Sequence, residues 1–282
     1  MAPVIEALPP LPGLDETHGL LLVHAHPDDE SITTGATMAH YAAAGVPVTL
    51  VTCTRGEQGE VIGAEIAHLF GDGEALAAHR EAELASAMTA LGVTDHRFLG
   101  AAQGRRYRDS GMVWGPDGLA RVPDDVDPRA FAVADLDTAA TELAAVIDQV
   151  QPGVVVTYDP GGGYGHPDHV QASRVAARAV ELAHSAPRLV WVVAPRSVDV
   201  RGRELLRAQG MQVRESEADP SMIVEDDLAR YETRGPVLAK AAALRAHASQ
   251  VIVAPDERSF ALSNLVWQPL SGAEYFMDAT TG

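Results

Sequence analysis

Short apolar runs that alternate with longer Ala-rich stretches constrain the fold of this 282-residue chain more than any other feature. The apolar runs are Leu20–His24, Pro47–Thr54, His96–Gly100, Gly153–Asp159 and Arg188–Pro195. The stretches with helical spacing are Thr33–Ala44, Ala77–Leu91, Ala134–Val150 and His169–His184. Continuous apolar runs are typical of strands buried on both faces, as in a parallel sheet. The alternation predicts an α/β, Rossmann-like fold in which helices flank a mostly parallel sheet.

The rest of the chain departs from this pattern in two places. Residues 100–129 are polar and show little periodicity, which is typical of a long functional loop. Beyond Ser197 the strand and helix signals weaken, until Gly235–Val251 gives a clear helical pattern. Since no linker or low-complexity tract divides the sequence, we expect a single domain over residues 1–282 with C-terminal embellishments. Residues 1–18 are expected to form a weakly ordered lead-in.

Composition excludes several classes of protein. A formal net charge of −18 argues against nucleic acid or an anionic membrane as partner, because both require basic patches. No apolar run approaches the roughly 18 residues of a membrane span, and the N-terminal residues lack a signal-peptide pattern, so we expect a cytoplasmic protein. The single cysteine, Cys53, excludes an intramolecular disulfide. Nucleotide-binding and serine-hydrolase motifs are also missing from the sequence.

The tripeptide His-Pro-Asp occurs twice, at residues 26–28 and 166–168, each time directly after a predicted strand. Ligand sites of parallel sheets form beyond the carboxyl ends of the strands, so the two loops are expected to meet there. Together the loops offer His24, His26, Asp28, Asp29, Glu30, Asp159, Tyr164, His166, Asp168 and His169. This density of imidazole and carboxylate groups predicts a metal site.

The spacing of these side chains leaves the ligand set open. A catalytic zinc ion takes three protein ligands and keeps a position for water. His26 and Asp29 are three residues apart, as are His166 and His169, but a site with all four would be closed. Two histidines and one aspartate suit Zn²⁺, or Fe²⁺ where iron is available. A helix-capping turn at Asp28 is the simpler alternative, and the repetition of the tripeptide disfavours it.

The segments "AHPDDE" and "GHPDH" resemble the LmbE-like (PIG-L) zinc-dependent deacetylases. Further segments such as "VTCTRGEQGEVIG", "YRDSGM" and "AHASQV" are similar to the mycothiol-pathway branch of that family in actinobacteria. That branch removes acetate from N-acetylglucosaminyl-inositol. The resemblance extends from about Leu20 to Asn264 and is weakest over residues 197–231.

The resemblance implies roles for individual residues. His26, Asp29 and His169 match the ligands of one Zn²⁺ ion, with Fe²⁺ as an alternative. Asp28 matches the general base, which lies next to a ligand but does not bind the metal.

Three further residues are expected to act on the reacting group. His166 matches the residue that stabilises the oxyanion and assists the leaving amine, Asp168 the partner that orients it, and Tyr164 a mobile tyrosine. The positions that correspond to sugar-recognising residues are Arg80, Asp109 and Met112.

The expected partner is thus a small amino-sugar substrate, and a homo-oligomer is compatible with the sequence. The alternatives are the sister amidase that cleaves mycothiol S-conjugates and a deacetylase of another N-acetylglucosaminyl compound. A sugar-binding protein with a structural metal is the alternative that is not an enzyme. We further expect Glu30 to brace its loop through backbone or Arg contacts, and His247 to be a structural or surface residue, with contact to the substrate pocket as the alternative.

Overall fold

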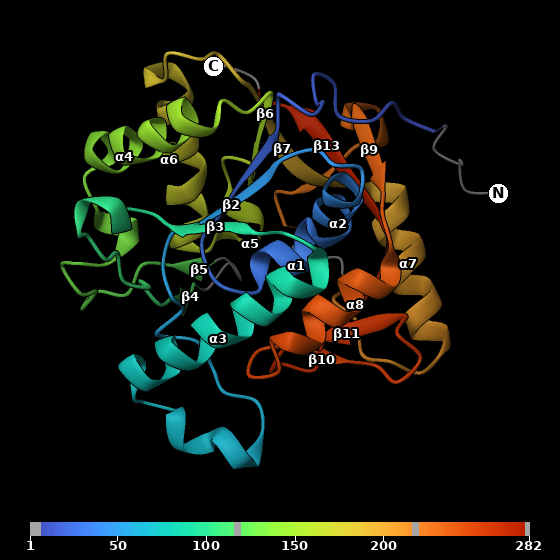
Figure 1. Cartoon of the computed structure of the whole chain (residues 1–282). Coiled ribbons are helices and arrows are strands. Elements are labelled where there is room, and N and C mark those ends of the chain that lie inside the picture. The colour runs from blue at the N-terminus through green and yellow to red at the C-terminus, as the bar shows by residue number, and fades with distance from the viewer. Residues whose placement is uncertain (1–6, 116–119, 216–219, 280–282) are drawn as a thin grey trace.

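The computed structural model describes residues 7–115, 120–215 and 220–279. Its centre is an eight-stranded sheet with the order β3-β2-β1-β6-β7-β13-β9, in which β8 also pairs with β7 (Figure 1). Five of its parallel strands are β1 (Leu20–His24), β2 (Val48–Thr52), β3 (Asp95–Phe98), β6 (Val154–Thr157) and β7 (Arg188–Pro195). These strands coincide with the five apolar runs, and the predicted mostly parallel α/β fold is confirmed.

The C-terminal part of the chain completes this sheet. β13 (Ala273–Asp278) is antiparallel to both β7 and β9 (Tyr231–Arg234), and the short β8 (Ile223–Val224) is parallel to β7. The sequence analysis missed β8 and β9 because they have only two and four residues, and it missed β13 because Glu274 and Asp278 limit its apolar run to three residues. A small separate sheet is the expected embellishment, formed by β10 (Ile252–Val253), β11 (Ser259–Ala261) and β12 (Trp267–Pro269).

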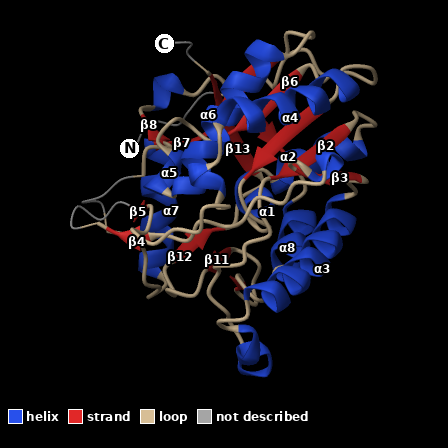
Figure 2. Ribbon diagram, turned by 90° about the vertical axis from the view of Figure 1, so that its left-hand side faces the viewer, coloured by secondary structure: helices blue, strands red, loops and turns tan. Residues whose placement is uncertain are grey.

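Helices cover both faces of the central sheet (Figure 2). One face packs against α2 (Gly35–Ala43), α3 (Gly73–Leu91) and α8 (Val237–Ala246). The other face packs against α4 (Leu136–Val150) and α6 (Pro167–Leu182). Successive side chains of a strand point to opposite faces, so Leu20 and Leu22 of β1 join the first core and Leu21 and Val23 the second. This double burial explains the continuous apolar runs.

The remaining elements are short or lie beside the sheet. They are α1 (Asp29–Thr33), α5 (Gly162–Gly165), α7 (Arg196–Ala208), the hairpin of β4 (Val113–Trp114) and β5 (Ala120–Arg121), and 3₁₀ turns at Ala64–Leu69, Ala101–Gln103, Phe131–Val133 and Asp226–Leu228. Residues 1–6 of the expected lead-in lie outside the described residues. Leu11 of its described part is buried in the first core. None of the described helices is long and apolar enough to cross a membrane.

The strand order places the two His-Pro-Asp loops side by side. β1 pairs with β6 through Leu20–Val154 and Leu22–Val156, so the carboxyl ends of the two strands are neighbours. The loop after β1 continues into α1, and the loop after β6 continues through α5 into α6. The expectation that these loops meet at one edge of the sheet is therefore confirmed.

A buried ion pair connects β13 to the helices on the first face. Lys240 of α8 lies 2.7 Å from Glu274 of β13, measured from Nζ to Oε1, and both side chains are buried. The Glu274 carboxylate also accepts the backbone N–H groups of Ala36 (3.0 Å) and Thr37 (2.8 Å). These donors belong to the first turn of α2, where backbone N–H groups have no partner within the helix. The last strand of the sheet therefore caps α2.

The Lys240→Met substitution is expected to lower the free energy of unfolding by about 3–5 kcal/mol, because it leaves the Glu274 carboxylate buried without its cation. Urea unfolding followed by circular dichroism measures the change. The double variant Lys240→Met/Glu274→Gln removes both charges and is expected to recover part of the loss. A loss below about 1 kcal/mol in the single variant would contradict this account of the pair.

Candidate metal centre

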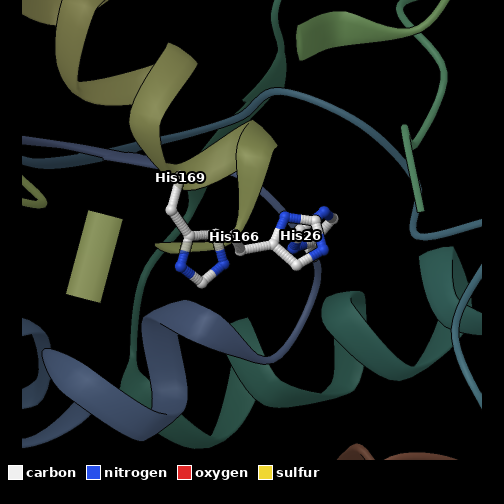
Figure 3. Close-up of side chains that lie close together, drawn as sticks. All are labelled: His26, His166 and His169. Atoms are coloured by element: carbon white, nitrogen blue, oxygen red, sulfur yellow. The ribbon is translucent and has the colours of Figure 1, made fainter. Parts of the chain in front are cut away.

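The side chains of His26, His166 and His169 converge at the carboxyl edge of the sheet (Figure 3). His26 lies in the loop after β1, and Asp29 is the first residue of α1. His166 is the N-cap of α6, followed by Pro167 in the first turn, where proline has a favourable backbone angle and needs no hydrogen-bond acceptor. The same turn of α6 carries His169, so the sequence of this loop fixes the distance between the two histidines.

Two of the three predicted metal ligands, His26 and His169, lie close to one carboxylate oxygen of the third, Asp29. Asp29 Oδ2 lies 3.3 Å from His26 Nδ1 and 3.4 Å from His169 Nε2. Donor atoms that bind one tetrahedral zinc ion at ~2.0–2.1 Å are about 3.4 Å apart, so this spacing suits such an ion. His169 Nε2 is buried and forms no hydrogen bond with any described residue. The donor types of His26, Asp29 and His169 suit a divalent metal, and the distances from Asp29 to each of the two histidines suit a shared ion.

The same cluster contains further donors. Two groups of three bring their ligand atoms within 4.8 Å of one another, namely His26-His166-His169 and His26-Asp109-Asp168. His26 belongs to both groups because its two ring nitrogens have different neighbours. Its Nδ1 points toward Asp29, while its Nε2 lies 3.2 Å from Asp168 Oδ2 and 3.6 Å from Asp109 Oδ1.

Tyr158, which the sequence analysis did not single out, supports two of the predicted ligands. Its hydroxyl donates to Asp29 Oδ2 at 2.7 Å and accepts the backbone N–H of Ala25 at 2.9 Å. Its ring stacks on His169, with the ring centroids 4.2 Å apart and the planes at 8°. Burial and the adjacent Asp29 carboxylate raise the pKa of Tyr158 well above its ordinary value, so the hydroxyl keeps its proton. Its signal in the sequence is its position at the end of a predicted strand.

Asp168, expected to orient His166, directs its carboxylate elsewhere. Its Oδ2 lies 3.2 Å from His26 Nε2 and accepts the backbone N–H of Ser110 at 3.0 Å, and the Ser110 hydroxyl donates to its Oδ1. His166 is joined to this residue by a different hydrogen bond, from the Asp168 backbone N–H to His166 Nδ1 at 3.2 Å. The N-cap role of His166 accounts for that contact. Ser110, which the sequence analysis missed, comes from the polar loop of residues 100–129.

Asp28 has an unusual backbone conformation, with φ at 118° and ψ at −35°. A non-glycine residue held in such a region costs on the order of 1–3 kcal/mol and needs support from its surroundings. The backbone N–H of Asp28 donates to Glu30 Oε2 at 2.9 Å, and its Oδ2 lies 3.3 Å from Arg80 Nη2. Burial raises the pKa of the Asp28 carboxyl to about 6, and the nearby Arg80 opposes this rise.

Arg80, one of the predicted sugar-recognising residues, lies beneath the loop. Its guanidinium is buried and donates to the backbone oxygens of Gly56, at 2.9 Å, and of Pro27. Gly56 is needed for this approach, because a Cβ there would lie 1.9 Å from Arg80 Nη1 and its φ of +69° disfavours other residues. The described contacts of Arg80 are therefore with the protein, and a role in sugar binding stays a prediction.

Two of the remaining predicted residues, Asp109 and Tyr164, lie beside the histidines. Asp109 is buried and accepts the backbone N–H groups of Gln58 (3.2 Å) and Gly111 (2.8 Å). Met112 is half-buried in the same loop. The ring centroid of Tyr164, which is 36% exposed, lies 5.3 Å from that of His169.

An exposed tryptophan, missed by the sequence analysis, lies beside Tyr164. Trp114 in β4 is 61% exposed, and its ring centroid is 6.1 Å from that of Tyr164. The two aromatic rings together give the described residues around the histidines an apolar border. Nothing in the sequence distinguished Trp114, because the polar loop around it has no regular pattern.

A buried group of histidines and carboxylates at the carboxyl edge of an α/β sheet, with the buried carboxylate of Asp28 in the same loop, is typical of metal-dependent hydrolases. The chain belongs to the PIG-L family, described as GlcNAc-PI de-N-acetylase, whose sequence model matches residues 21–180.

Relatives of known name agree with this membership. The 1D-myo-inositol 2-acetamido-2-deoxy-alpha-D-glucopyranoside deacetylase of Kineococcus radiotolerans is 49% identical over 282 residues, covering 93% of this chain and 78% of the relative. The protein of the same name from Streptomyces scabiei is 50% identical, covering 92% of this chain and 84% of the relative. A deacetylase from the teicoplanin biosynthesis pathway, solved with teicoplanin, shares the fold with a TM-score of 0.56 at 19% identity, covering 93% of this chain and 99% of that one.

The contacts of Ser110 predict an effect on metal affinity. Removing its hydroxyl in Ser110→Ala takes one donor from Asp168, which contacts His26, and outer partners of metal ligands typically contribute 10–100-fold. We therefore expect the dissociation constant for Zn²⁺ to rise by roughly 10-fold or more, measured by competition with a chromophoric chelator. Ser86→Ala on the exposed side of α3 is the matched control. Equal affinities of the two variants would show that this contact does not support the metal centre.

Proposed function

We propose that this protein hydrolyses the acetamide of N-acetylglucosaminyl-inositol (1D-myo-inositol 2-acetamido-2-deoxy-α-D-glucopyranoside), giving glucosaminyl-inositol and acetate in mycothiol biosynthesis. The observation that carries the proposal is the position of one Asp29 carboxylate oxygen within 3.4 Å of ring nitrogens of both His26 and His169, with the buried Asp28 preceding Asp29 in the chain. The names of relatives about 50% identical over more than nine-tenths of the chain support the choice of substrate. A cytoplasmic location of the protein is part of this proposal.

In this proposal His26, Asp29 and His169 hold the ion, which is Zn²⁺, with Fe²⁺ as the alternative. Such an ion supplies a Lewis acid for the acetamide carbonyl and lowers the pKa of water toward about 7. The three side chains leave a ligand position open, as a catalytic ion requires. The second nitrogen of His26 faces Asp168, and a carboxylate in that place fixes the orientation of a liganding imidazole.

Asp28 accepts the proton of the attacking water in this mechanism. Its carboxylate is buried next to the ligand Asp29, so it is close to the reaction without belonging to the ligand set. Arg80 at 3.3 Å favours the ionised form, which is the form that a general base needs.

In this mechanism the side chains of Tyr164 and His166 lie on the side of the reacting carbonyl opposite to Asp28. Burial raises the pKa of the Tyr164 hydroxyl, which therefore remains a donor for the developing oxyanion. Burial, together with the neighbouring His26 and His169, lowers the pKa of His166 to about 2, so its ring is neutral before reaction. Asp28, which now carries the proton taken from the water, protonates the amine nitrogen directly or by way of His166, and the carbon–nitrogen bond then breaks.

The sugar and the inositol require polar groups and an apolar surface at the border of the site. Asp109 and Met112 stay proposed sugar contacts, and Arg80 is proposed to act chiefly on the loop that carries Asp28. Trp114 and Tyr164 offer a surface on which the C–H face of a sugar ring can pack. The excess of acidic residues in the chain does not repel an amino-sugar product.

The main alternative is an amidase that cleaves mycothiol S-conjugates with the same ligands. Steady-state rates on N-acetylglucosaminyl-inositol and on bimane-labelled mycothiol separate the two, since amine release and acetate release are measured directly. Faster cleavage of the mycothiol conjugate would overturn the proposed substrate. A protein that binds sugars around a structural metal would release no product from either compound.

The Asp28→Asn substitution is expected to lower kcat by roughly 10²–10⁴-fold, because it removes the base while keeping the size of the side chain. Asparagine tolerates a positive φ, so the loop should keep its shape. Metal content, measured by plasma emission spectrometry, should equal that of the wild type. His26→Ala is the contrasting variant and should lose the metal. A fully active Asp28→Asn variant would exclude Asp28 as the base.

The Trp114→Ala substitution is expected to raise KM by roughly 3- to 10-fold, because it removes the apolar surface beside Tyr164. A contact that binds substrate and transition state equally changes KM and leaves kcat near its original value. Trp114→Phe retains an aromatic ring and should stay close to the wild type. If Trp114→Ala leaves KM unchanged, the sugar does not pack on this residue.

A further inference from the structure

Glu30 and His247 form a buried pair that none of the proposed catalytic steps uses. Both residues are 0% exposed, and Glu30 Oε1 lies 2.7 Å from His247 Nε2. The two residues are far apart in the sequence, and His247 lies outside residues 21–180, which match the family model. A carboxylate withdrawn from water is costly unless it is paired, so the position of Glu30 depends on that of His247.

Glu30 directs its two carboxylate oxygens to different partners. One oxygen, Oε1, contacts His247 and accepts the Ser31 hydroxyl at 2.5 Å, while the other, Oε2, accepts the backbone N–H of Asp28 at 2.9 Å. This N–H belongs to the residue whose φ of 118° is unfavourable for any side chain. Two further contacts hold Asp28, from Ile32 N–H to its backbone oxygen at 3.0 Å and from Arg80 to its carboxylate. Rotation of the Glu30 side chain would remove the hydrogen bond to the backbone N–H of this strained residue, Asp28.

The turn that carries His247 is itself fixed to the body of the protein. His247 ends α8, and Ser249 in the same turn donates to Glu83 of α3 through its backbone N–H (2.7 Å) and its hydroxyl (2.6 Å). The backbone oxygen of Ser249 also accepts the N–H of Ile62 at 2.8 Å. These contacts allow the C-terminal part of the chain to act as a rigid support for the loop after β1.

We propose that Glu30 and His247 are positioning residues, which keep Asp28 in its strained conformation so that its carboxylate faces the reacting group. Neither residue touches the substrate. The inference rests on the proposed role of Asp28 as general base. It differs from the alternative that His247 reaches the substrate pocket, because its contact is with Glu30 and its side chain is fully buried.

The first test compares two substitutions of His247. His247→Phe keeps a ring but removes the donor to Glu30, and we expect kcat on N-acetylglucosaminyl-inositol to fall by roughly 10- to 100-fold, since misplacing a catalytic group by about 1 Å costs up to this much. KM and metal content should stay at the wild-type values. His247→Gln can place a donor near the position of Nε2 and should recover most of the activity. His184→Phe, at an exposed histidine, is the matched control.

A double variant separates positioning from stability. Glu30→Leu/His247→Phe replaces both polar partners by apolar side chains, which usually restores stability because no unpaired charge remains buried. We expect its melting temperature to return toward that of the wild type while kcat stays low. Recovery of both quantities would overturn the proposal, because it would show that the pair only stabilises the fold. A kcat within twofold of the wild type in metal-replete His247→Phe would also overturn it.

Hydrogen exchange gives a readout that needs no turnover. Amide exchange of the peptide that contains residues 26–32, followed by mass spectrometry, should accelerate in His247→Phe and in the double variant but not in His184→Phe. Unchanged exchange in both variants would contradict the proposal even if the wild type used another substrate. Failure of the proposed function appears separately, as a wild-type enzyme that releases no acetate from N-acetylglucosaminyl-inositol. If His247→Phe does not fold, the double variant carries the same comparisons, with His247→Gln as the variant expected to stay active.

Discussion

One carboxylate oxygen, Asp29 Oδ2, joins the two loops on which the site depends. It accepts the backbone N–H of His26 at 2.9 Å and the Tyr158 hydroxyl at 2.7 Å, and it lies next to His169 Nε2. Because these donors come from the loop after β1 and from the end of β6, the oxygen can occupy its place only when both strands are correctly paired. The pairing of β1 with β6 thus fixes the relative positions of these donors.

The parts of this arrangement that could be predicted from the sequence are those with a local pattern. The apolar runs predicted five strands, and the two His-Pro-Asp tripeptides predicted the loops that bring His26, Asp29, His166 and His169 together. Contacts between distant segments had no such pattern. Ser110 reaches Asp168 from an irregular loop, and the imidazole that Asp168 faces depends on side-chain directions that a sequence does not show. His247 was noticed through the family resemblance, but its partner Glu30 could not be inferred.

The proposed reacting groups and the residues that support them lie in different parts of the chain. The segment that matches the family model contains every proposed metal ligand and Asp28. The later residues contribute side chains that support this segment, through His247 at Glu30, Ser249 at Glu83 and Glu274 at the first turn of α2. Because of this arrangement, the polar loop of residues 100–129 at the border of the site can change in sequence to suit different substrates. The reacting groups meanwhile keep their geometry.

The position of β13 also has a consequence for synthesis of the chain. This late strand enters the sheet between β7 and β9, and its Glu274 caps α2, which was made much earlier. While the ribosome is still adding the last segment, one edge of β7 is unpaired and the first turn of α2 has no acceptor for two of its N–H groups. Open strand edges are prone to pair with other chains. We therefore expect a nascent chain to be inactive and prone to association with other chains until β13 is inserted into the sheet.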